Sequence, residues 1–151
     1  MKLAEALQIR ADIQKRIAQM NSRLSNNAVV QEGEKPAEDP NQLLTELDGY
    51  LRQLEDLMVR INLTNSQTQT PNGSLTALIA HRDCLKMKVS SYHDFLESAS
   101  CLARRNTHTE IKILSSVPVV DLRKKYDKLS QELRETDTQI QAANWTTDLI
   151  E

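Results

Sequence analysis

The chain has 151 residues, of which 39% are apolar and 26% charged, a composition typical of soluble globular proteins. Nineteen basic and 21 acidic residues give a net charge of −2, which argues against a dedicated nucleic-acid binder because such proteins carry a basic excess. Three glycines and four prolines are too few for the many turns of an all-β sandwich. Length and composition therefore favour a single helical domain over residues 1–151.

Four segments carry apolar residues three and four positions apart, the spacing of one buried helix face. Asp39 and Pro40 form a helix-start signal, since Asp caps a helix N-terminus and Pro fits its first turn. The spacing predicts helices over about 2–25, 40–62, 74–104 and 118–143. The second helix has the most regular apolar pattern, and its predicted seam is Leu44, Leu47, Leu51, Leu54, Met58 and Ile61.

Two short segments outside these helices have the residue pattern of strands. Residues 28–32 are rich in valine, and residues 109–114 alternate between polar and apolar side chains. A single isolated strand is not stable, so we expect the two segments to pair as a small ribbon.

The predicted architecture is mainly α: an elongated four-helix bundle of antiparallel, coiled-coil-like helices. Each apolar stripe is narrow and aromatic residues make up only 3% of the chain, so one copy builds a thin core. Self-association would bury more apolar surface, and we therefore expect a homo-oligomer.

The sequence predicts a cytoplasmic protein. Glu5, Arg10 and Asp12 interrupt the apolar run that a secretory signal needs, and no apolar stretch approaches the length of a membrane span. Cys84 and Cys101 lie too far apart on one predicted helix for an internal disulfide, so we expect reduced thiols.

No complete catalytic or metal-binding pattern can be written from the sequence. His81 and Cys84 have zinc-ligand spacing, but the rest of a zinc set is not supplied. Glu132, Glu135 and Asp137 are similar to the acidic helix of all-α nucleotide pyrophosphatases, whose magnesium site needs a second acidic helix. We therefore assign no catalytic, cofactor or metal residues, and keep a metal-dependent all-α nucleotide hydrolase as an alternative.

Seven residues are candidates for partner contact: Arg104, Arg105, Lys112, Arg123, Lys124, Lys125 and Trp145. The basic members could meet phosphate, anionic lipid or an acidic protein surface. We favour the alternative that they pair with the acidic loop at 32–39, within one chain or between subunits. Trp145, the only tryptophan, is expected either to anchor the chain end or to contact a partner subunit.

Four stretches, at 1–7, 30–40, 110–112 and 137–149, resemble a septicolysin-like family of small uncharacterised bacterial proteins. The resemblance covers nearly the whole chain and implies a helical fold and a bacterial origin. The septicolysin label implies cytolytic, membrane-active behaviour, but it supplies no catalytic residues. From the residues themselves we expect a non-enzymatic, self-associating structural or interaction protein, with membrane activity as an alternative.

Overall fold

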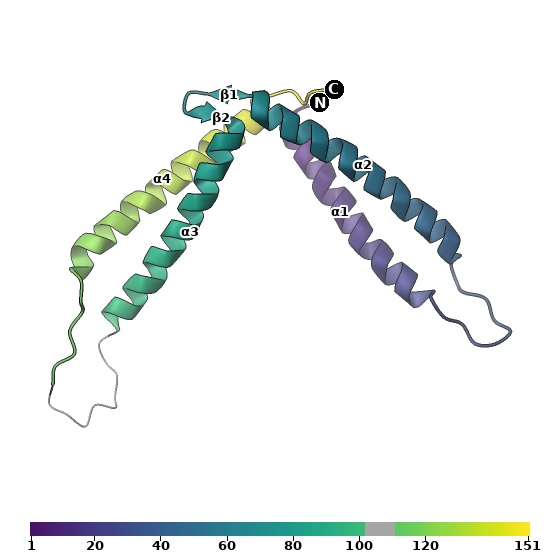
Figure 1. Cartoon of the computed structure of the whole chain (residues 1–151), viewed down its shortest axis with the longest axis horizontal. Coiled ribbons are helices and arrows are strands. Elements are labelled where there is room, and N and C mark those ends of the chain that lie inside the picture. The colour runs from purple at the N-terminus through teal and green to yellow at the C-terminus, as the bar shows by residue number, and fades with distance from the viewer. Residues whose placement is uncertain (102–110) are drawn as a thin grey trace. The chain divides into compact units, whose positions relative to one another are not determined.

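A computed structural model describes residues 1–101 and 111–151 of the chain (Figure 1). Within these ranges the chain forms helices α1 (Leu3–Asn26), α2 (Pro40–Gln67), α3 (Leu75–Ser100) and α4 (Val119–Thr146). Two short strands, β1 (Gln69–Thr70) and β2 (Gly73–Ser74), pair in antiparallel fashion. The predicted mainly α class, with four long helices and a small ribbon, is confirmed.

The contacts of the chain divide it into two compact units. The first unit comprises Met1–Ser74 and Ala143–Glu151, and therefore holds α1, α2, the ribbon and the end of α4. The second unit is Leu75–Ala142, which holds α3 and most of α4. Each unit contains one antiparallel pair of long helices (Figure 1). The single domain expected over residues 1–151 stays a prediction.

Side-chain caps explain where α1 ends and α2 begins. The Asn27 side-chain amide donates to the carbonyl oxygen of Arg23 over 2.8 Å, and its oxygen accepts from the backbone amide of Glu38 over 3.0 Å. Asn27 thus ends α1 and also closes the loop that follows it. The carboxylate of Asp39 accepts from the backbone amide of Asn41 over 2.9 Å, so the predicted start signal of α2 is confirmed.

The predicted ribbon position is wrong. Residues 28–32 and 111–114 form turns or irregular backbone, and residues 109 and 110 lie outside the described part of the chain. The observed ribbon pairs Gln69 with Ser74 and Thr70 with Gly73, around the turn at 71–72. Gly73 has a φ of 111°, a conformation that favours glycine. A tight local turn brings two short strands together more readily than two segments far apart in sequence.

Three helices bury the faces that their spacing predicts. The buried or half-buried positions of α1, α3 and α4 repeat at intervals of three and four, with Met20, Leu85 and Ile140 among the buried members. Three helix ends differ from the prediction. Helix α2 continues from 62 to 67, α4 continues from 143 to 146, and α3 ends at 100 instead of 104. Cys101 is not helical, and residues 102–104 are not described.

Two threonines near the C-terminal end of α2 bond back to the preceding turn. The hydroxyl groups of Thr64 and Thr68 donate to the carbonyl oxygens of Arg60 and Thr64, over 2.8 and 2.7 Å. Both hydroxyl groups are therefore satisfied inside the helix or at its C-cap.

The predicted seam of α2 is wrong at alternate positions. Leu43, Tyr50 and Leu57 are buried or half-buried, one residue before Leu44, Leu51 and Met58, together with the expected Leu47, Leu54 and Ile61. Thr64 continues this row and is also buried. Leu44, Leu51 and Met58, which were expected in the core, are 49%, 45% and 42% exposed. Helix α2 therefore carries two overlapping rows of mostly apolar residues, and both rows contain Leu47, Leu54 and Ile61. Only one of these rows packs against α1.

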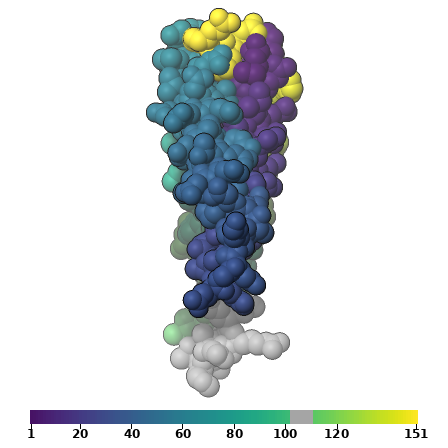
Figure 2. Space-filling model, turned by 90° about the vertical axis from the view of Figure 1, so that its right-hand side faces the viewer, coloured from purple at the N-terminus to yellow at the C-terminus, as the bar shows by residue number. Residues whose placement is uncertain are grey.

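Backbone hydrogen bonds tie the two chain ends together within the first unit. Leu3 donates to the carbonyl oxygen of Thr147 over 3.0 Å, and Leu149 donates to that of Met1 over 2.9 Å. The Lys2 ammonium group lies 2.9 Å from the carboxylate of Asp148. Figure 2 shows the last residues, in yellow, against the start of α1, in purple. Because Leu149 is buried, the C-terminal segment is part of the packed structure.

Helix α2 holds the same C-terminal segment through Thr64 and Arg60. The backbone amide of Ile150 donates to Thr64 Oγ1 over 3.0 Å, and Arg60 Nε donates to the carbonyl oxygen of Ile150 over 2.8 Å. Thr64 is only 1% exposed. Water therefore has little access to replace its hydroxyl group as the acceptor for Ile150.

Replacing Thr64 with valine tests this buried bond. We expect Thr64→Val to lower the free energy of unfolding by about 1–3 kcal/mol, because the part-buried Ile150 amide loses its acceptor. Urea denaturation measures this change, and faster hydrogen exchange at the Ile150 amide locates it. Thr64→Ser keeps the hydroxyl group and should retain the Ile150 protection. If the valine variant protects that amide as well as the wild type, the bond does not hold the segment.

A pair of leucine substitutions tests the packed row of α2. Leu57 is 6% exposed and Leu63 is 45% exposed, although both lie on the same helix. We expect Leu57→Ala to cost about 2–5 kcal/mol of unfolding free energy, because it leaves a cavity beside α1. Leu63→Ala should cost less than about 1 kcal/mol, since it removes little buried surface. Urea denaturation compares the two variants, and equal losses would contradict the observed register.

Candidate functional site

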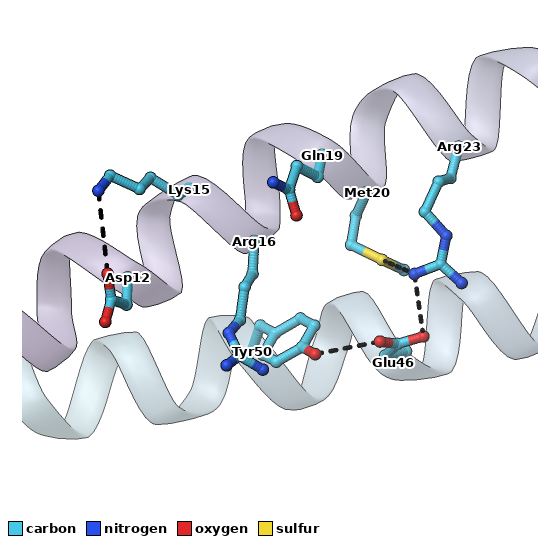
Figure 3. A pocket seen from close by; sticks show the side chains of 8 residues that line it. All are labelled: Asp12, Lys15, Arg16, Gln19, Met20, Arg23, Glu46 and Tyr50. Carbon is cyan, nitrogen blue, oxygen red and sulfur yellow. Dashed lines mark hydrogen bonds and ion pairs between the residues drawn. The ribbon is translucent and has the colours of Figure 1, made fainter.

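A groove of about 450 Å³ lies between α1 and α2 in the first unit (Figure 3). Helix α1 supplies most of its wall, and α2 supplies an acid and an aromatic ring. The lining residues are Asp12, Lys15, Arg16, Gln19, Met20, Arg23, Glu46 and Tyr50. Three basic side chains make the groove the first place to look for a bound anion.

Carboxylates of the same unit pair with two of these three cations. Arg23 donates through Nε to Glu38 Oε2 over 3.1 Å and through Nη2 to Glu38 Oε1, and its Nη1 lies 3.6 Å from Glu46 Oε2. Lys15 lies 3.9 Å from Asp12, with both side chains exposed. Much of the positive charge of the groove is therefore already paired within the unit.

The remaining polar groups of the groove orient one another. The Tyr50 hydroxyl donates to Glu46 Oε1 over 3.1 Å, and the Arg16 guanidinium lies 6.0 Å from the centre of the Tyr50 ring (Figure 3). Neither serine nor cysteine lines the groove, so it lacks those nucleophiles. Its geometry fits a polar joint that locks α1, α2 and the loop between them.

Most of the predicted basic residues in the described chain are exposed. Lys112 precedes α4, while Arg123, Lys124 and Lys125 lie in its first turns. The Lys125 ammonium lies 5.6 Å from the centre of the Tyr92 ring. Across residues 1–101 and 111–151, none of these four cations has a carboxylate within 4 Å. The remaining candidates, Arg104 and Arg105, lie outside the described residues.

One carboxylate of the acidic loop at 32–39 pairs with a residue outside the predicted basic group. Glu38 binds Arg23, and this bond lowers the pKa of Glu38 below its ordinary value. The same contact raises the pKa of Arg23. Sequence reasoning missed the pairing because the two residues belong to different elements.

Trp145 lies in the last turn of α4 and is 55% exposed. Lys2, Thr64 and buried Leu149 hold the chain end, and the expected role of Trp145 in anchoring it stays a prediction. Its other expected role, contact with a partner, stays a prediction.

The acidic residues compared with a magnesium site have protein partners. Glu132 Oε1 lies 3.0 Å from His81 Nε2, and Asp137 lies 3.5 Å from Arg82. Glu135 accepts from Gln131 over 2.8 Å. A search of the described residues finds no group of three or more His, Cys, Asp or Glu placed to hold a metal ion. The position of Arg82 in the sequence could have predicted an ion pair, because a cation in an apolar seam requires a partner on the facing helix.

Replacing Arg23 tests the charge pairing in the groove. Because the pKa of Glu38 is lowered in the folded protein, its stabilising effect is present above the unfolded pKa, about 4.3, and is lost as the pH falls through the folded pKa. We expect Arg23→Gln to raise the pKa of Glu38, measured by NMR titration of its side-chain carboxyl carbon. Arg16→Gln is the control, since Arg16 stacks on Tyr50 instead. An unchanged Glu38 pKa in the Arg23 variant would contradict the assignment.

Within the described residues, the helices lack the length and apolarity needed to cross a membrane. A family model, described as a family of unknown function (DUF6847), matches residues 10–149. No curated protein matches the chain.

A solved structure is also similar. It is described as the crystal structure of a functionally unknown conserved protein from Corynebacterium diphtheriae. The sequences are 38% identical, the match covers 99% of each chain, and the TM-score is 0.92. The chain belongs to DUF6847, a family of unknown function.

Proposed function

We propose that the protein is a non-enzymatic helical protein that associates with itself and presents the sides of its paired helices as binding surfaces. The observation that carries this proposal is the number of large apolar side chains left exposed on the helices. They are Ile9 on α1, Leu44, Leu51, Met58, Val59 and Leu63 on α2, Met87 and Phe95 on α3, and Val120 and Trp145 on α4.

The arrangement of the helices accounts for this exposure. Each unit contains one pair of long helices, so each helix has one facing partner within its unit. Fully burying a Leu or Met side chain that was exposed contributes about 1.5–3 kcal/mol. Covering several of these side chains with a second copy would therefore supply a substantial part of a dimerisation free energy.

We place the protein in the bacterial cytoplasm. Cys84 and Cys101 are both free and exposed. Exposed thiols persist in a reducing compartment, whereas an oxidising one favours disulfides between chains. The bacterial setting rests on the likeness to the septicolysin-like family.

Sedimentation tests self-association. In reducing buffer, between about 1 and about 100 µM, we expect the mass to rise from 17.2 kDa toward a whole multiple of it. This range extends about a hundredfold above a Kd near 1 µM, which corresponds to about −8.2 kcal/mol. A mass of 17.2 kDa over the whole range would contradict the proposal.

Two activity assays provide the controls. The purified protein should neither consume nucleoside triphosphate with Mg²⁺ nor release dye from neutral or anionic vesicles. Turnover would favour the hydrolase alternative, and leakage would favour the membrane-active one.

A further inference from the structure

We draw no further inference here: the strongest candidate, the exposed apolar side of α2 formed by Leu44, Leu51 and Met58, carries none because nothing in the part of the chain that the structure describes shows what covers it.

Discussion

The packing of α2 against α1 is the interaction on which the first unit depends. Leu43, Leu57 and Ile61 are buried on α2, and Ile13 and Met20 are buried on α1. One partner helix covers only part of the circumference of α2. The contact with α1 buries only some of the apolar residues of α2. The adjoining side of the helix is therefore apolar and exposed. The exposure of Leu44, Leu51 and Met58 follows from this mismatch.

The sequence predicts the helices well and their contacts less well. Intervals of three and four identify four helices, and Asp39 marks a start, because both signals are local. The register of α2 is not local. Its two apolar rows share Leu47, Leu54 and Ile61, and the packed row includes Tyr50 and Thr64, whose polar groups hide it from a pattern of purely apolar residues. Tyr50 reaches Glu46 and Thr64 reaches the chain end, which explains why polar residues occupy a seam.

At the candidate sites, too, the sequence predicts the residues better than their contacts. Composition and charge locate exposed basic residues such as Arg123 and Lys124. They do not show that Arg23 binds Glu38 or that Arg82 meets Asp137, because these partners come together only after the helices pair. A charged residue inside an apolar seam predicts that a partner exists but not which carboxylate it is. Pairings of this kind tie two basic side chains of the α1–α2 groove, Lys15 and Arg23, to carboxylates.

Most polar bonds of the first unit are made within it. Its chain ends are tied to each other and to Thr64, and Lys15 and Arg23 of its groove pair with carboxylates of the same unit. What remains uncovered is an apolar side of α2, with Leu44, Leu51 and Met58. Covering that side would draw mainly on the hydrophobic effect, whose strength is roughly proportional to the apolar area removed from water.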